Sequence, residues 1–250
     1  MKKLVSLLMA LTLVFACVGC GASDGNGSKA DEDVKSEGVM TYEEYVAAAL
    51  DSEVVIEAYV QAKQSWWEDK ATVYAQDKDG GYFLYNMACS EDDYAKLTTG
   101  TKIKVTGFKA EWSGEVEIID AAFEIEDGNY VAAAEDVTSL LGSDDLINHQ
   151  NKFVSFKGMT VEAAGQDGSG NDVPFLYNWD GSGQEGDDLY FNVSSNGQTY
   201  TFTVESYLCD SSTDVYKAVQ GLNIGDTVDM EGFLYWYEGV NPHITSLTVK

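Results

Sequence analysis

The chain has 250 residues, of which 42 are acidic and 15 basic, so its formal net charge is −27 at pH 7. Every basic residue is Lys, because the sequence contains no Arg. A surface this negative repels phosphate, and without Arg there is no bidentate phosphate fork. Composition therefore argues against a general nucleic-acid binder. With 44% hydrophobic and 12% aromatic residues, the chain is also too apolar for a disordered acidic tail.

Residues 1–20 have the pattern of a bacterial lipoprotein signal peptide. Two lysines precede the apolar run Leu4–Ala16, which is too short to span a membrane. The cysteines that follow resemble the lipobox cysteine that is cleaved and lipidated, and both Cys17 and Cys20 fit that place. The alternative is an ordinary secretory signal with incidental cysteines. The resemblance implies an extracytoplasmic lipoprotein, anchored to the cell membrane by N-terminal acyl chains such as palmitate.

Residues 21–40 are expected to form a flexible acidic linker. Between Gly21 and Gly38 only Val34 is bulky and apolar, so this stretch cannot bury much surface. The pattern Thr41-Tyr-Glu-Glu44 is typical of a capping box and predicts a helix as far as Leu50. Residues 136–141 are expected to open a second unit in the same way, so the sequence predicts domains over 41–128 and 129–250.

An internal repeat supports two domains of one kind. Gly100–Phe108 reappears as Gly225–Phe233, with one glycine at the start of the segment and another just before the Phe. Apolar residues alternate with polar ones between the glycines, which predicts a half-buried strand in each copy. The glycines indicate a turn into the strand and a close approach or a bulge within it.

Each repeat also contains a β-hairpin. Residues 72–85 carry Asp79-Gly80 at the expected tip, and residues 189–204 carry Asn196-Gly197. Such dipeptides supply the positive φ angles that tight hairpins need. An earlier strand is expected before each hairpin, over 54–62 and 153–163. A cysteine and a short helix are expected after each, over 92–97 and 213–219.

This order of strand, hairpin, short helix, strand and strand is that of the OB-fold, a five-stranded partly open barrel. The chain resembles the OB-fold modules of bacterial surface lipoproteins and of secreted nucleases over about residues 52–126 and 152–250. We therefore expect an all-β protein of two tandem five-stranded barrels, the second with an inserted Gly/Asp-rich loop at 164–188. Two small sandwiches are the rival architecture. The resemblance implies an accessory or ligand-binding role.

The aromatic residues indicate where a ligand would bind. OB-folds bind ligands on strands 2 and 3, between the loops that join strands 1–2 and 4–5, and all five Trp fall in or beside those loops. An aromatic cleft in each barrel would stack a planar or sugar-like ligand beside nearby carboxylates. These are Glu68, Asp69 and Glu111 in the first unit and Asp180 and Glu238 in the second. The alternative is that these rings close the barrel ends. The candidate ligand-binding residues are Trp66, Trp67, Tyr74, Tyr85, Trp112, Trp179, Tyr190, Trp236 and Tyr237.

The acidic charge favours a glycan, peptide or protein ligand, and nucleic acid is unexpected. Weak binding of single-stranded nucleic acid by the first unit is the runner-up, since aromatic platforms with a cationic groove suffice for it. The first unit has seven lysines, although Lys102 and Lys104 fit an ordinary solvated strand face. These seven are Lys63, Lys70, Lys78, Lys96, Lys102, Lys104 and Lys109.

The sequence favours neither an enzyme nor a bound cofactor. It shows no nucleophile–base motif, phosphate-binding loop or metal-ligand spacing around its two histidines. The Gly-rich acidic loops 167–172 and 180–188 are the best candidates for Ca²⁺, with a solvated insertion as the alternative. Cys89 and Cys209 occupy equivalent places in separate barrels, so buried free thiols are expected there.

Overall fold

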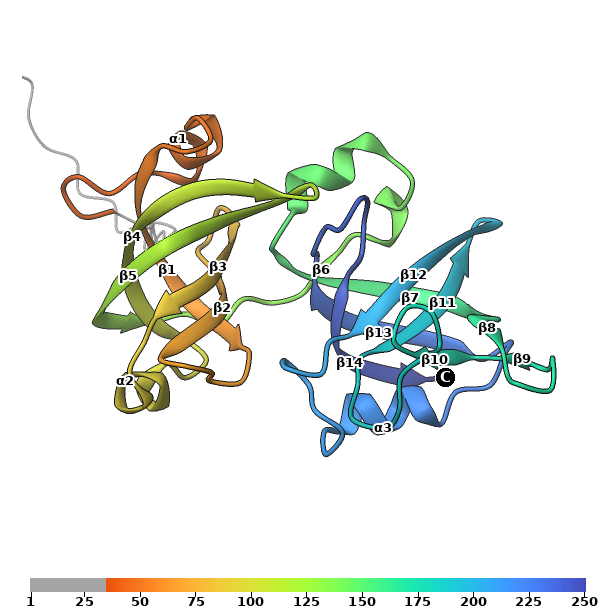
Figure 1. The fold of residues 1–250 in the computed structure, drawn as a ribbon. Coiled ribbons are helices and arrows are strands. Elements are labelled where there is room, and N and C mark those ends of the chain that lie inside the picture. The colour runs from red at the N-terminus through yellow and green to blue at the C-terminus, as the bar shows by residue number, and fades with distance from the viewer. Residues whose placement is uncertain (1–34) are drawn as a thin grey trace, which may run out of the picture. The chain divides into compact units, whose positions relative to one another are not determined.

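A computed structural model describes residues 35–250, and Figure 1 shows the strands and short helices that they form. The expected signal peptide, the candidate lipidation sites Cys17 and Cys20, and most of the expected linker lie outside the described residues. The last part of that linker is bound to the first barrel: Met40 N donates to Val55 O at 2.8 Å. Among the described residues no helix is both long and apolar enough to cross a bilayer.

The first unit is a closed barrel of five strands in the order β1-β2-β3-β5-β4, and β4 pairs with β1 to close it. All neighbours are antiparallel except β3 and β5, which pair in parallel. A short helix, α2, joins β3 to β4. The elements are β1 (Glu53–Lys63), β2 (Lys70–Gln76), β3 (Gly81–Ala88), α2 (Glu91–Lys96), β4 (Thr101–Trp112) and β5 (Glu115–Asn129).

The second unit repeats this topology. Its strands follow one another as β11-β12-β14-β13-β7, and pairing of β11 with β7 closes the ring. The parallel pair is again between the third and fifth strands, β12 and β14. The elements are β7 (Phe153–Glu162), β11 (Leu189–Ser195), β12 (Gln198–Val204), α3 (Asp214–Gln220), β13 (Thr227–Phe233) and β14 (His243–Val249). Both units thus have the expected OB-fold strand order, and the alternative of two sandwiches is wrong.

Smaller elements surround the barrels. The inserted loop is partly ordered on the second barrel, because its last strand pairs with β11. The elements are α1 (Tyr42–Ala47), β6 (Glu135–Asp136), the 3₁₀ helices η1 (Thr138–Leu140) and η2 (Asp144–His149), β8 (Gly165–Gln166), β9 (Asp172–Val173) and β10 (Phe175–Tyr177).

The helix opening each unit is shorter than expected. The capping box is present, since the Thr41 hydroxyl and the Glu44 carboxylate cap each other's backbone N–H. The helix nevertheless ends at Ala47 and not at Leu50. There the buried Lys109 ammonium donates to the carbonyls of Tyr45, Val46 and Ala48 and so satisfies the helix end. The second expected helix is only the 3₁₀ turn η1.

The glycine inside each repeated strand is required by close packing. A Cβ on Gly107 would lie 2.7 Å from Ile118 Cγ2, and one on Gly232 would lie 2.2 Å from His243 O. The strand pairing shifts register at both places. The expected close approach and bulge are therefore confirmed in both barrels.

The two hairpin tips differ. Asn196 and Gly197 have φ angles of 53° and 79°, as a two-residue tight turn requires. Asp79-Gly80 does not adopt positive φ, so the expectation for the first tip is wrong. There the Asp77 carboxylate accepts from the N–H groups of Asp79 and Gly80 at 2.8 and 2.7 Å, and this side-chain closure replaces the tight turn.

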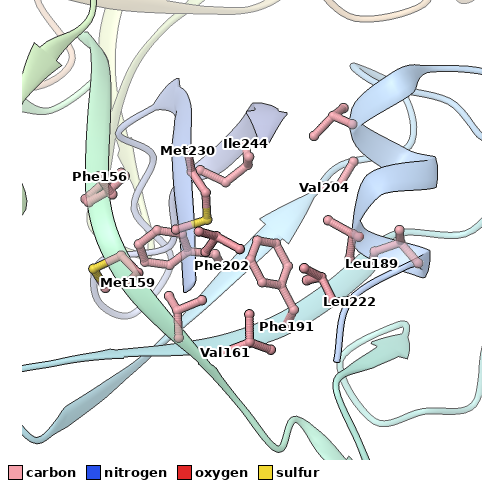
Figure 2. Close-up of a cluster of buried hydrophobic side chains, with 14 of the residues drawn as sticks. Phe156, Met159, Val161, Leu189, Phe191, Phe202, Val204, Leu222, Met230 and Ile244 are labelled. Atoms are coloured by element: carbon pink, nitrogen blue, oxygen red, sulfur yellow. The ribbon is translucent and has the colours of Figure 1, made fainter. Parts of the chain in front are cut away.

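Each barrel has its own hydrophobic core. Figure 2 shows that of the second barrel, where Phe156, Phe191 and Phe202 meet Met159 and Met230 with no solvent exposure above 1%. A third, smaller cluster of buried aromatic side chains joins β2 and β3 to β13 and the segment after it. It consists of Tyr74, Phe83, Phe233 and Tyr235.

Candidate binding cleft

A cleft of about 560 Å³ lies on strands β11 and β12 of the second barrel. Tyr190 on β11 contributes to its floor. Trp179 from the inserted loop and Tyr237 from the loop between β13 and β14 form its sides. Trp112, at the end of β4, completes the wall, with its ring centroid 5.1 Å from that of Tyr237. Four of the nine candidate aromatic residues therefore line one cleft.

The loop of the second barrel that carries Tyr237 is held against the β4–β5 hairpin. Glu238 N donates to Ser113 O at 2.7 Å, and Trp236 N donates to Glu115 Oε2 at 2.9 Å. The fully buried Glu115 carboxyl is thus part of the junction. These contacts fix Trp112 beside the ligand face of the second barrel. The expectation of one aromatic cleft per barrel is replaced by a single cleft to which both contribute.

Three carboxyl groups line the cleft, those of Asp188, Glu205 and Glu238, and the first two are held by hydrogen bonds. Glu205 is 8% exposed and accepts from Gln64 Nε2 at 3.0 Å and from Tyr207 N at 3.1 Å. Burial, together with the charge of Asp188, raises the pKa of Glu205 to about 7. Asp188 accepts from the N–H and hydroxyl of Ser206 at 2.8 and 2.6 Å. At neutral pH the cleft is therefore polar and negative beneath its aromatic walls.

His243 adds a neutral surface to the cleft. Its ring stacks on Tyr235 with the centroids 4.2 Å apart, and Nδ1 lies 2.7 Å from the Tyr74 hydroxyl. Burial lowers the pKa of His243 to about 3, so the imidazole is uncharged at neutral pH. The expectation for Tyr74 needs correction. Its ring is fully buried and stacked on Phe233, so it is inaccessible to a ligand.

The other candidate aromatic residues lie outside the cleft. Trp66 Nε1 donates to Cys89 O at 2.9 Å, which anchors the loop between β1 and β2. Trp236 packs against the core of the second barrel. Trp67 is 69% exposed. Tyr85 lines a separate hollow on the first barrel. Trp66 and Trp236 therefore have the packing role that was the alternative for the tryptophans.

The hollow beside Tyr85 has a volume of about 830 Å³ and lies mainly over β3 and β5 of the first barrel. One lysine, Lys70, lines it, together with the four carboxylates of Glu68, Asp69, Glu117 and Asp120. The Trp residues of the first barrel do not line it. The hollow is therefore acidic, in contrast to the cationic groove that the runner-up needs.

Several of the seven lysines in this barrel have internal partners. Lys102 Nζ lies 2.8 Å from a carboxylate oxygen of Glu57 and 3.1 Å from one of Glu126. The expectation that Lys102 lies on a solvated strand face is therefore wrong. Lys109 caps α1, and Lys63 Nζ lies 3.6 Å from the centre of the Tyr94 ring. Three of the seven lysines are thus neutralised or used in packing, which leaves less charge for the cationic groove that the runner-up needs.

The two candidate thiols and the loop that begins at Asp167 lie outside the lining of the cleft. Cys89 and Cys209 are buried free thiols, as expected. In the loop proposed for Ca²⁺, Asp167 Oδ1 accepts from the N–H groups of Ser169 and Asn171 at 2.8 and 2.9 Å. No group of three or more potential metal ligands occurs among residues 35–250. Binding of Ca²⁺ stays a prediction.

Sequence reasoning missed two of the three carboxyl groups that line the cleft. It selected Asp180 and Glu238 in the second unit, of which only Glu238 lines the cleft. Asp188 directly precedes β11 and Glu205 directly follows β12, so they flank the hairpin in the sequence. Acidic residues at the outer ends of those two strands are the signal that could have identified them.

No protein-family model and no curated protein matches the chain. Among solved structures, a murine DNA-binding protein bound to double-stranded DNA is similar at 10% identity and a TM-score of 0.36, over 78% of this chain and 94% of that one. A HINa domain in complex with double-stranded DNA gives 11% and 0.35, over 80% and 98%. A replication protein A heterotrimer bound to single-stranded DNA gives 11% and 0.32, over 79% and 49%. Similarity this low carries no argument about function, and the OB-fold assignment rests on the strand order.

Proposed function

We propose that the protein is a binding module, and not an enzyme, that holds a neutral or cationic glycan or peptide in the cleft of its second barrel. The observation that carries the proposal is the convergence of Trp112, Trp179, Tyr190 and Tyr237 around Glu205. Aromatic faces stack on the apolar faces of sugar rings or on side chains. Carboxylates accept hydrogen bonds from hydroxyl and amine groups. The cleft offers both in one place.

The charge of the cleft supports a ligand without phosphate groups. Its described lining contains the carboxyl groups of Asp188, Glu205 and Glu238 and no lysine. His243 is uncharged there because burial lowers its pKa to about 3. Affinity for a nucleic-acid backbone comes mainly from cationic side chains that release counterions. A neutral or positively charged ligand avoids the repulsion that a phosphate would meet.

Single-stranded nucleic acid on the first barrel is the second candidate. The exposed rings of Trp67 and Tyr85 favour it, because a lysine lies near both in the fold. The backbone of Lys70 forms a β-bridge with that of Trp67, and Lys70 lines the hollow beside Tyr85. Base stacking on aromatic rings with a nearby cation is sufficient for weak, sequence-tolerant binding. The four carboxylates of that hollow act against it.

Titration of intrinsic Trp fluorescence with cell-wall oligosaccharides, short peptides and single-stranded DNA separates these candidates. Trp179→Ala should weaken glycan or peptide binding about tenfold, a loss of about 1.4 kcal/mol. Trp67→Ala is the matched control, since it removes an exposed Trp outside the cleft. If only DNA binds, with a strong salt dependence and loss in Trp67→Ala, the second candidate replaces the first.

The proposal includes an extracytoplasmic location with a lipid anchor at Cys17 or Cys20. Metabolic labelling with a palmitate analogue should mark the full-length protein and fail in one of the variants Cys17→Ser and Cys20→Ser. Labelling that persists in the double variant would contradict the anchor without affecting the proposal for the cleft.

A further inference from the structure

Asp188 and Glu205, two of the three carboxyl groups that line the cleft, lack a cationic partner within the described chain. Both hydrogen bonds that the Asp188 carboxylate accepts fall on Oδ1, from Ser206. Glu205 accepts from an amide and a backbone N–H, which are neutral donors. Neither carboxylate forms an ion pair with any lysine of residues 35–250. Other carboxylates of the molecule do, among them Asp77 with Lys35 and Glu57 with Lys102.

This absence of a partner has an electrostatic consequence. Two carboxyl groups that repel each other in a half-enclosed site are stabilised by any cation placed between them. The raised pKa of Glu205 has burial as its main cause and Asp188 as its second. The groups around Glu205 offer no compensating charge within the described chain; they are Asp188, Tyr74, Tyr190, Tyr235, Cys209 and the neutral His243.

The walls of the cleft favour the same kind of ligand. The rings of Trp112, Trp179, Tyr190 and Tyr237 surround the carboxyl groups. The faces of aromatic rings attract a cation, by about 0.5–1 kcal/mol at exposed sites and about 2 kcal/mol when the cation is desolvated. Aromatic walls above carboxylates therefore select an organic cation over a hydrated metal ion, because the metal ion would make no use of the rings.

We propose that the cleft recognises a ligand through a primary ammonium group, held by Asp188 and Glu205 while the carbon frame of the ligand lies against the aromatic walls. An ammonium group has three N–H donors. No hydrogen bond from the described residues falls on Asp188 Oδ2, and each Glu205 carboxylate oxygen accepts one and keeps a second lone pair. An amino sugar with a free amine and a lysine side chain share this chemistry. The inference rests on the proposed function, since it specifies the ligand of that same cleft.

The test compares ligands that differ only at the nitrogen. Isothermal titration at pH 7 uses a glucosamine tetramer against its N-acetylated counterpart, and a lysine peptide against its acetyl-lysine form. Acetylation removes the positive charge and leaves the rest of the ligand in place. At least one free amine should bind tenfold or more tightly than its acetylated partner, and the pair that shows the difference identifies the source.

Two variants localise the effect. Asp188→Asn keeps the acceptor for Ser206 and removes the charge, so it should reduce the preference for the amine to less than threefold. Asp180→Asn is the matched control in the same inserted segment. Asp180 lies outside the cleft, and the variant keeps its acceptor for Ser182 N, so its preference should equal that of the wild type.

Three other outcomes would overturn the ammonium inference, and one of them would also overturn the proposed function. Equal affinity for amine and acetylated ligands would overturn the ammonium inference while the proposed glycan or peptide function stands. Failure of all four ligands to bind would overturn both. If Asp188→Asn kept the full preference for the free amine over the acetylated ligand, the inference would also be overturned, because residues other than Asp188 would then bind the ammonium group.

Discussion

The junction between the β4–β5 hairpin and the second barrel contains a buried carboxyl group whose protonation should govern stability. Glu115 is fully buried and accepts from the backbone N–H of Trp236 and from Gln150 Nε2. Its other oxygen, Oε1, has no hydrogen-bond partner among the described residues. Burial raises the pKa of Glu115 to about 8, with a smaller contribution from Glu117. The group is therefore mainly protonated at neutral pH.

The direction of the pH effect follows from proton binding. Between pH 4.5 and 8 the folded chain keeps the Glu115 proton that the unfolded chain has lost, so stability falls as the pH rises. The full effect, reached above pH 8, is on the order of 5 kcal/mol, since one pKa unit corresponds to 1.36 kcal/mol. Below pH 4.5 both states hold the proton and the effect vanishes.

Glu115→Gln removes this titration and keeps an oxygen that can accept from Trp236 N–H. Urea unfolding at pH 5, 7 and 9 measures the free energy of unfolding of variant and wild type. The free energy of unfolding of the variant, relative to that of the wild type, should rise by roughly 3–4 kcal/mol between pH 5 and pH 9. The exposed Glu43→Gln is the control and should run parallel to the wild type. If the free energy of unfolding of Glu115→Gln changed with pH in parallel with that of the wild type, the reasoning that Glu115 is a buried titrating group at the junction would be refuted.

Three further predictions follow from buried polar groups. Lys109→Met leaves the carbonyls at the end of α1 without a donor, so the free energy of unfolding should drop by about 2 kcal/mol; urea unfolding unchanged within 0.5 kcal/mol would contradict the capping role. Tyr74→Phe removes the hydroxyl from His243 Nδ1 and should cost about 1 kcal/mol in the same assay, whereas an unchanged midpoint would mean the bond contributes nothing. Burial raises the pKa of Cys209 to about 12, so native protein at pH 8 should react with a thiol reagent at Cys209 far more slowly than unfolded protein, and equal rates would argue against a buried thiol.

The fold could be predicted because its determinants are local. Alternation of apolar residues, hairpin spacing and the glycines at 107 and 232 are properties of short segments, and each segment formed the expected strand. The first hairpin tip was mispredicted because the Asp77 side chain closes that turn, and a dipeptide pattern does not include such a contact. The end of α1 was mispredicted for the same reason, since Lys109 reaches it from β4.

The candidate site could be predicted only in part. The placement of Trp112, Trp179 and Tyr237 in OB-fold binding loops was readable from strand order. The sequence did not show that both barrels contribute to a single cleft, because this depends on the contact between two hairpins far apart in the chain. The net charge of −27 also does not show which charged side chains are paired inside the fold. Lys102 and Lys109 are used in internal contacts, whereas Asp188 and Glu205 have no lysine partner within residues 35–250.

The most direct test of the binding cleft is the ¹⁵N–¹H spectrum of the Trp indole groups, since the sequence has only five. Titration with a glycan or peptide that binds should shift the indole signals of Trp112 and Trp179, which line the cleft. Those of Trp66 and Trp67, on the first barrel's own loop, should stay unchanged. Shifts confined to Trp66 and Trp67 would place the ligand on the first barrel and contradict the account.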